Sequence, residues 1–234
     1  GIVNMAAAMS KRGVIAHVCC LTKSGIFAER LPATSKVVEL GKPSHLSVLT
    51  ILKLRMALRH LNANIVHSHN WSGLFYAALS DPFHRRMLVQ GEHAQLTGWE
   101  KVERRIEWRR RLYKRCNVVH TVSEGQREEL VALGISNHEE IQVLKNGVDA
   151  EFFFPGDKFE SRASLGLPSD GFYIGMVARC IADKRHDRVL QAFEDMAKTY
   201  PKAHLLLAGD GGDVCLQVRH LISLHPFKDR VHWL

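Results

Sequence analysis

Two cations that follow a strand-like run are the residues in this chain best suited to bind phosphate. Residues 173–178 form an apolar run typical of a buried strand, Arg179 follows it, and Lys184 precedes a helical pattern. Ligands of open α/β sheets bind outside the carboxyl ends of the strands, and cations beside a helix N-terminus suit a diphosphate. The spacing therefore predicts a diphosphate site, with a solvated charged loop as the alternative.

Polar or glycine residues also follow the other strand-like runs. Because the carboxyl ends of parallel strands share one edge of a sheet, we expect these residues to converge on one cleft between two domains. Glycine at such a point lets the backbone approach a ligand closely. The residues at these positions are His67, His69, Glu92, His93, Thr121, Ser123, Glu124, Gly209, Asp210 and Gly211.

Each of these residues also has a purely structural explanation. His69 could be satisfied by a backbone carbonyl, and Glu92 could pair with a nearby arginine. Ser123 and Glu124 could be a helix N-cap and a first-turn acid. Residues 208–212 could be only a strand-to-helix turn.

Strand-like and helix-like segments alternate along the chain, which predicts a parallel, doubly wound α/β fold. The predicted helices are residues 1–13, 46–61, 72–79, 99–115, 123–133 and 185–199. The predicted strands are residues 14–21, 64–69, 86–90, 117–122, 140–144, 172–178, 203–209 and 230–234. Turn signals between residues 145 and 171 interrupt the pattern. We therefore expect two domains, residues 1–146 and 147–234.

Composition limits the partners and the chemistry. The 234 residues carry a formal net charge of +8, which favours polyanionic partners. Five cysteines without a CxxC pair predict free thiols in a reducing compartment, and fourteen histidines without metal-ligand spacing predict no metal. No apolar run reaches the roughly 18 residues that a membrane span needs.

The predicted helix over residues 99–115 carries much of the positive charge. A solvated face is the usual explanation, and attraction to anionic lipid headgroups is the sharper one. Nucleic acid would use the same charge, but the few aromatic residues here argue against base stacking. Its basic residues are Lys101, Arg104, Arg105, Arg109, Arg110, Arg111, Lys114 and Arg115.

Several motifs together resemble the family-4 retaining glycosyltransferases, which have the GT-B fold of two Rossmann-like parallel-sheet domains facing a cleft. The resemblance runs through most of the chain. Residues 143–156 are similar to the interdomain motif of that family, and residues 174–193 and 203–212 to its donor-domain motifs. Residues 63–70, 91–95 and 120–124 resemble its acceptor-domain motifs.

The resemblance implies roles for individual residues. Arg179 and Lys184 would be catalytic residues that hold the diphosphate of a nucleotide sugar and stabilise the leaving group without a metal. His69, the third catalytic residue, would sit near the sugar and acceptor. Gly209, Asp210 and Gly211 would bind the donor. The acceptor or the cleft would involve Gly1, His67, Asn70, Glu92, His93, Ser123 and Glu124. The hinge would be Asn146, Gly147, Val148 and Asp149.

The implied activity is transfer of a sugar, with retention, from a nucleotide-diphosphate sugar to a glycan or lipid-linked acceptor, as in surface polysaccharide or glycolipid synthesis. No cofactor and no nucleic acid partner are expected. The expected location is the cytoplasm, with peripheral contact through residues 99–115 at the inner face of the membrane. A nucleotide-sugar epimerase of the same architecture, or a non-catalytic basic module that binds nucleic acid or membrane, is the alternative.

The sequence departs from the family pattern at several points. Ala178 and Arg185 stand where glycine is usual. Gly1 resembles the last glycine of a glycine-rich loop, so the first strand of the N-terminal domain is expected to be missing. The chain stops before the acidic segment that grips the donor sugar. Both domains are therefore expected to be incomplete, and a fragment of this extent to be weakly active or inactive.

Overall fold

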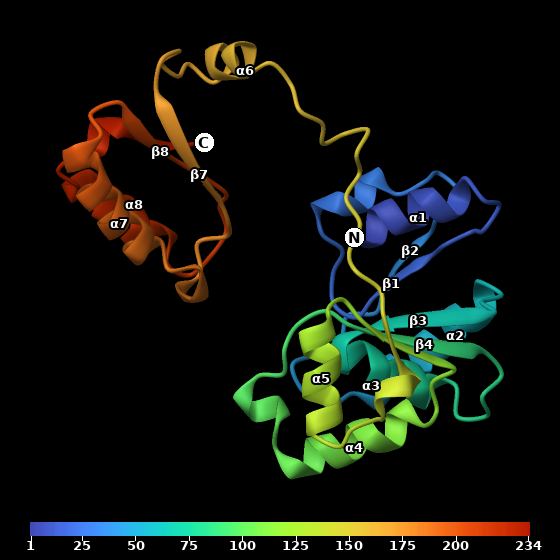
Figure 1. Ribbon diagram of the computed structural model, residues 1–234. Helices are drawn as coiled ribbons and strands as arrows, with labels where there is room; N and C mark the ends of the chain where they lie inside the picture. Colours follow the sequence, from blue (N-terminus) through green and yellow to red (C-terminus); the bar gives the residue numbers. More distant parts are fainter. The chain divides into compact units, whose positions relative to one another are not determined.

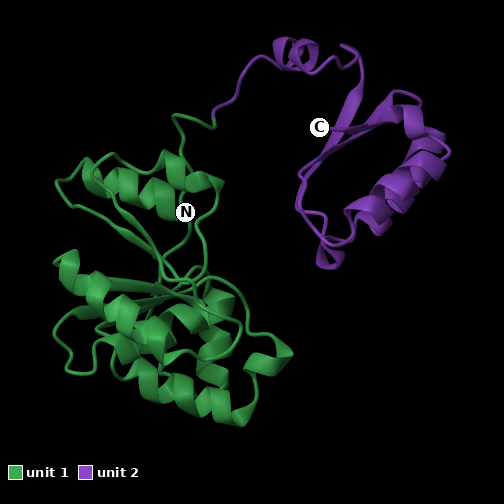
Figure 2. Ribbon diagram, turned by 180° about the vertical axis from the view of Figure 1, so that it is seen from behind, with its two compact units in different colours: residues 1–153 green, residues 154–234 purple.

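The computed structural model describes residues 1–234 and divides them into two compact units, Gly1–Phe153 and Phe154–Leu234 (Figure 2). The division lies a few residues beyond Gly147, in the same turn-rich segment. Each unit has a parallel β-sheet and an apolar core of its own. The predicted parallel α/β fold class is thereby confirmed.

The main sheet of unit 1 contains four parallel strands in chain order. They are β3 (Ile65–His69), β4 (Met87–Glu92), β5 (Val118–Thr121) and β6 (Ile141–Val143). In the register of the sheet, His69 lies beside Gly91, and Gly91 lies beside His120. The polar ends of β3, β4 and β5 therefore share one edge.

Three helices pack with this sheet to form the largest core cluster of unit 1. These helices are α3 (Asn70–Ser80), α4 (Glu103–Tyr113) and α5 (Glu124–Ala132). Leu74 of α3, Ile106 of α4 and Leu130 of α5 lie in this cluster with Ile141 of β6. The core holds the sheet edge in place because the loops that carry the polar residues connect these packed elements.

A smaller two-stranded sheet and two more helices complete unit 1. They are β1 (Val18–Cys20), β2 (Val37–Glu39), α1 (Ile2–Ser10) and α2 (Val48–His60). Ser47 caps α2, since its side chain accepts a hydrogen bond from the Thr50 N–H. Leu54 and Leu58 of α2 pack with Leu40 in a separate core cluster. Strand β2 is absent from the sequence-based prediction.

Unit 2 has one three-stranded parallel sheet in chain order and three helices. Its elements are α6 (Lys158–Ser164), β7 (Phe172–Val177), α7 (His186–Thr199), β8 (Ala203–Ala208), α8 (Cys215–Leu224) and β9 (Val231–Trp233). Helices α7 and α8 lie on one face of the sheet (Figure 1), where Leu190 and Phe193 pack against Leu205 and Leu207. Val177, at the end of β7, is 86% exposed.

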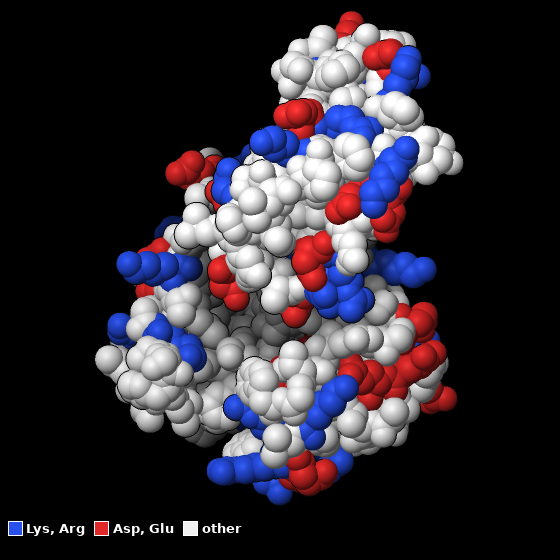
Figure 3. Space-filling view, turned by 90° about the vertical axis from the view of Figure 1, so that its left-hand side faces the viewer, with Lys and Arg blue, Asp and Glu red and all other residues white.

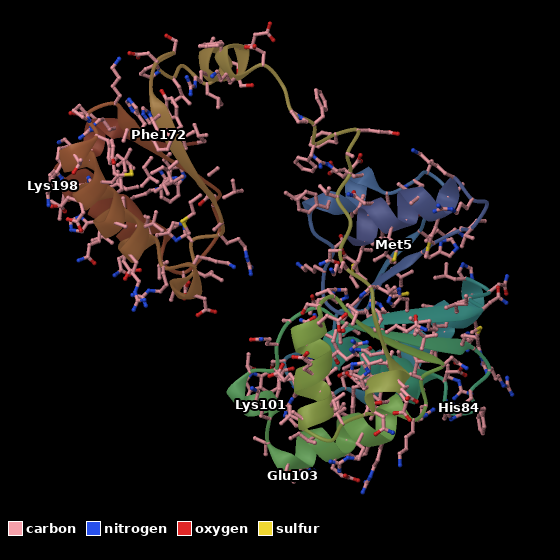
Figure 4. The ribbon with its side chains drawn as sticks, viewed as in Figure 1. Met5, His84, Lys101, Glu103, Phe172 and Lys198 are labelled. Carbon is pink, nitrogen blue, oxygen red and sulfur yellow. The ribbon has the colours of Figure 1, made fainter.

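Short 3-10 turns connect several of these elements. They are η1 (Ile26–Arg30), η2 (Gly98–Glu100), η3 (His138–Glu140), η4 (Ala182–Lys184) and η5 (Lys228–Arg230). Turn η2 corrects the single helix predicted over residues 99–115. Thr97 and Glu100 form a capping box that closes a separate turn, and α4 begins after the extended Val102. Lys101 and Glu103 lie at this junction (Figure 4).

Residues 144–157 connect the two units without a helix or strand. Asn146, Gly147, Val148 and Asp149 are exposed here. The Asp149 carboxylate accepts hydrogen bonds from the N–H groups of Glu151 and Phe152, at 3.1 and 3.2 Å. No helix anywhere in the structure has the length and apolar character needed to cross a bilayer.

Candidate functional site

Four histidines form a hydrogen-bonded cluster at the carboxyl edge of the unit 1 sheet. The Nε2 atoms of His67 and His120 lie 2.9 Å apart, and His69 Nδ1 lies 2.7 Å from His93 Nε2. The ring centres of His67 and His69 are 4.3 Å apart, so the two pairs are in contact. Imidazoles from β3, from the loop after β4 and from β5 therefore lie together at the carboxyl edge of the sheet.

The absence of a side chain at Gly91 lets the histidine rings approach one another. A Cβ atom at Gly91 would lie 2.7 Å from His120 Nε2 and 3.0 Å from His93 Nε2, closer than atoms normally pack. The missing side chain lets imidazoles from β3 and β5 meet over β4. His120 is only 6% exposed and is not among the site residues predicted from the sequence, although it belongs to residues 120–124, which resemble an acceptor-domain motif.

The cluster is uncharged near neutral pH. Burial, followed by the neighbouring histidines, lowers the pKa of His67 and of His69 to about 4. Burial also lowers the pKa of His93 and of His120. A hydrogen bond between two neutral imidazoles joins one N–H donor to one bare nitrogen acceptor. Such groups can accept a proton or hydrogen-bond to a sugar hydroxyl.

Asn70 and Gly1 both lie close to the cluster. Asn70 begins α3 with φ 57°, a left-handed conformation that is uncommon for a residue other than glycine. Its Oδ1 accepts a hydrogen bond from the His93 N–H at 3.1 Å, which ties the end of β3 to the loop after β4. Gly1 lies at the start of α1, and burial is the largest cause of the lowered His93 pKa, against the opposite effect of Glu92.

Glu92 lies inside unit 1, which corrects the expectation that it lines an open binding site. It is 2% exposed. Its Oε1 accepts hydrogen bonds from Tyr113 Oη at 2.8 Å, Gln90 Nε2 at 3.1 Å and Arg109 Nε at 3.3 Å. Pairing with an arginine, the alternative weighed from the sequence, is what the structure shows. A buried carboxylate needs such partners because it has lost its water.

Ser123 and Glu124 make the contacts of a helix start. Ser123 Oγ accepts a hydrogen bond from the Gln126 N–H at 3.3 Å, so it caps α5. Glu124 forms an ion pair with Arg127 one turn along. Thr121 is fully buried and donates from its hydroxyl to the Ser123 carbonyl at 3.1 Å. Ser123 and Glu124 therefore act as the helix N-cap and first-turn acid that were the structural alternative in the sequence analysis. Ser123 is nevertheless exposed.

In unit 2, Arg179 and Lys184 lie on the loop between β7 and α7. Both side chains are exposed, and no carboxylate lies within ion-pair distance of either. Arg185 differs, since its guanidinium pairs with Asp187 at 2.7 Å and its φ of 52° starts α7. His186, which was not predicted as a site residue, is 4% exposed with Nδ1 lacking a partner. The loop thus carries two exposed cations without an ion-pair partner, Arg179 just after β7 and Lys184 just before α7.

The loop after β8 packs tightly against this cationic loop. Gly209 has φ 125°, and a Cβ atom there would lie 2.3 Å from the Ala178 carbonyl oxygen. A Cβ atom at Gly212 would lie 1.9 Å from the Cys180 carbonyl oxygen. Both glycines are needed for the two loops to touch. Gly212 is missing from the predicted site, although a second glycine beside Gly211 is a signal that could have revealed it.

Asp210 is hydrogen-bonded by Cys215, the first residue of α8. Its carboxylate accepts a hydrogen bond from Cys215 Sγ at 3.0 Å, and this bond is the largest cause of the lowered Asp210 pKa. The same contact, followed by one to Cys180, raises the pKa of Cys215 to about 12. All five cysteines are free thiols. No group of three or more His, Cys, Asp or Glu side chains has an arrangement suited to a metal ion.

Most cations of residues 99–115 are engaged within unit 1. Arg109 is 1% exposed and pairs with Glu92 and Glu100. Lys101 pairs with Glu129. Other contacts are those of Arg110 and Arg111 with Glu107, of Arg105 with the Trp99 ring, and of Arg115 with the Asp81 carbonyl. Basic and acidic side chains are also interspersed over the face shown in Figure 3. Arg104 and Lys114 remain without an ion-pair partner.

Two family descriptions cover nearly all of the chain. Glycosyltransferase Family 4 matches residues 1–152, and Glycosyl transferases group 1 matches residues 157–234. The match to both descriptions runs in the same order as the two compact units.

Curated relatives and solved structures agree with these matches. A D-inositol 3-phosphate glycosyltransferase of Mycobacterium leprae is 35% identical over 92 residues, which are 39% of this chain and 20% of that protein. A Stackebrandtia nassauensis protein of the same name is 25% identical over 171 residues, which are 68% of this chain and 39% of that protein. The Anabaena Alr3699/HepE structure in complex with UDP-glucose matches all of this chain and 64% of its own, with a TM-score of 0.76 at 19% identity. The chain therefore spans less than two thirds of each of these proteins.

Proposed function

The chain belongs to glycosyltransferase family 4, and we propose that the protein transfers a sugar from a nucleoside diphosphate sugar to an acceptor hydroxyl. The observation that carries this proposal is the pair of free cations, Arg179 and Lys184, on the loop at the start of α7. Support comes from the relatives, which are named as glycosyltransferases, and from HepE, which was solved with UDP-glucose.

The proposed chemistry follows from the loops of unit 2. Arg179 and Lys184 neutralise the diphosphate and the further charge that develops on it as the sugar leaves. Gly209 and Gly212 bring the two loops together, so backbone N–H groups can approach the phosphates. Two cations suffice for this neutralisation, so we propose that the reaction needs no metal. The finer proposals are retention at the sugar and a role in surface polysaccharide or glycolipid synthesis.

The histidine cluster of unit 1 is proposed to act on the acceptor or the sugar. His69 and His93 are neutral, hydrogen-bonded to each other and only partly buried. A neutral imidazole can hydrogen-bond to a hydroxyl and take up its proton. The acceptor we propose is a glycan or a lipid-linked sugar, used at the cytoplasmic face of a membrane. A phosphorylated polyol is the second candidate, because the relatives are named for D-inositol 3-phosphate.

Calorimetry of UDP binding to the full protein tests the donor site. Charge-assisted hydrogen bonds contribute about 1.5–3 kcal/mol each, so Arg179→Ala or Lys184→Ala should weaken binding about 10- to 150-fold. Lys202→Ala is the matched control, since Lys202 is an exposed cation of the same unit that pairs with Asp170. It should bind UDP as the wild type does. Unchanged binding by both loop variants would place the diphosphate elsewhere.

Product analysis separates transfer from epimerisation. A transferase consumes the nucleotide sugar in proportion to the acceptor supplied and releases a nucleoside diphosphate. An epimerase changes the sugar configuration with no acceptor present. Proton NMR of UDP-sugar incubated with and without acceptor distinguishes these outcomes, and addition of a chelator tests whether a metal is needed.

A further inference from the structure

Asn70 holds a strained backbone conformation at the edge of the histidine cluster. It directly follows His69 and begins α3, yet its φ is 57°, in the left-handed region. Asparagine tolerates this region better than most residues, but the conformation persists only where surrounding contacts fix it. Residues strained in this way cluster at active sites. The contacts of the Asn70 side chain therefore indicate what the strain serves.

The Asn70 side chain contacts the main chain of His93. Asn70 Oδ1 accepts a hydrogen bond from the His93 N–H at 3.1 Å, and this bond joins the end of β3 to the loop that follows β4. Asn70 is exposed and belongs to none of the apolar core clusters. The hydrogen bond therefore fixes the position of a loop at the site and adds nothing to the packing of the core.

The His93 ring in turn contacts His69. His93 Nε2 lies 2.7 Å from His69 Nδ1, so the pair occupies the δ nitrogen of His69 and leaves its ε nitrogen to meet a substrate hydroxyl. Two neutral imidazoles share one proton in such a bond. The position of the His93 ring therefore decides both the orientation of His69 and which of its nitrogens carries the proton.

The second histidine pair of the cluster is held in a different way. His67 and His120 lie within β3 and β5, where the ladder of the sheet fixes their main chains. His93 lies beyond the last residue of β4 and has no partner in the register of the sheet. Asn70 therefore supplies His93 with the main-chain hydrogen bond that the sheet supplies to the other pair.

We propose that Asn70 is a positioning residue that aligns His69 with its substrate through His93. This role depends on the proposed sugar transfer and deepens it, because it places Asn70 behind His69. From the sequence alone, Asn70 was expected to meet the acceptor or line the cleft. Its amide oxygen is instead used by the His93 N–H.

Two substitutions separate the hydrogen bond from the backbone conformation. Asn70→Asp keeps a side-chain oxygen acceptor and still tolerates the left-handed region. Asn70→Gly also tolerates this region but removes the acceptor. The matched control is Asn62→Gly, because Asn62 is an exposed asparagine with φ 49° just beyond α2 and outside the histidine cluster.

Steady-state transfer assays and thermal melts of the full protein test the proposal. Asn70→Gly should lower kcat about tenfold and change KM for the nucleotide sugar less than about twofold, because loss of the bond misplaces His69 without touching the donor loops. Asn70→Asp should keep kcat within about threefold of the wild type. Asn62→Gly should leave turnover unchanged. All three variants should shift the midpoint of thermal unfolding by about 4 °C or less.

NMR of isotope-labelled histidine side chains adds a measurement that needs no activity. The ring nitrogen signals of His69 should move in Asn70→Gly and stay in place in Asn62→Gly. If the wild-type protein transfers no sugar while these signals still move, the proposed function fails and the positioning of His69 by Asn70 stands.

Four outcomes would overturn the proposal. They are a wild-type kcat in Asn70→Gly, an equal loss of kcat in Asn70→Asp, an equal loss in the Asn62→Gly control, and His69 signals that do not move in Asn70→Gly. A raised KM for the acceptor at constant kcat would assign Asn70 to direct contact with the substrate instead.

Discussion

In unit 1 the polar residues at the sheet edge hydrogen-bond to one another, whereas in unit 2 the cations at the corresponding edge have no partner. His67, His69, His93 and His120 form two closed pairs, while Arg179 and Lys184 are exposed and unpaired. A ligand of unit 2 must therefore supply the missing negative charge. A ligand of unit 1 meets imidazoles that each use one ring nitrogen in a histidine pair, so it can bond only to a second nitrogen or displace a partner.

Loss of the buried Arg109–Glu92 pair beneath the unit 1 site should give the largest decrease in stability. Arg109→Ala leaves Glu92 buried without its cation, and loss of one partner of a buried pair costs about 3–5 kcal/mol. Urea unfolding monitored by circular dichroism should show this loss. The control Arg111→Ala, on the same helix but exposed and paired with Glu107, should cost about 1 kcal/mol or less. Similar losses for both would show that Arg109 is an ordinary surface cation.

Loss of the contact between the two loops of unit 2 should give the second-largest decrease in stability. Gly212→Ala forces a methyl group against the Cys180 carbonyl, so the glycine loop and the cationic loop must separate. We expect a loss of about 2–3 kcal/mol in stability and at least tenfold weaker UDP binding. Gly175→Ala is the matched control, because no atom lies within 4 Å of its added Cβ. If Gly212→Ala binds UDP normally, the contact between the loops is not needed for the donor.

His69 should matter for turnover more than for stability. Loss of a positioned acid or base typically costs about 100-fold or more in rate. His69→Ala removes one hydrogen bond to His93 at the partly exposed edge, so the midpoint of thermal unfolding should shift by only about 2–4 °C. Steady-state transfer assays and thermal melts on the same samples measure both quantities. His45→Ala, an exposed histidine outside the cluster, is the control, and unchanged turnover in His69→Ala would make His69 structural.

Acid should also lower the stability of unit 1, through the histidine cluster. His67 and His69 titrate near 4 in the folded protein and near their usual value of 6.5 when unfolded. The unfolded chain therefore binds more protons between these values, so stability falls as the pH drops from about 6.5 to about 4 and then levels off. The loss should be about 1–2 kcal/mol per histidine. Urea unfolding over this range should be flatter for His67→Gln/His69→Gln, and an equal slope would assign the titration to other groups.

Much of this architecture was predictable from local pattern. Alternating strand-like and helix-like runs predict a parallel α/β fold, since side-chain periodicity depends only on near neighbours in the chain. Arg179 and Lys184 could be selected because both lie on one strand-to-helix loop. The same reasoning fails at residues 99–115, where a capping box at Thr97 and Glu100 splits the predicted helix.

The remaining features depend on contacts between residues far apart in the sequence. Glu92 and Arg109 lie on different elements, and only packing of α4 on the sheet turns both from expected surface groups into a buried pair. The space above Gly91 exists only once β3, β4 and β5 are aligned. The sequence by itself determined the fold class and the cationic loop. The tertiary structure decided which charges are neutralised, which histidines meet and which side of α2 stays exposed, because burial is a property of the packed chain and not of its local pattern.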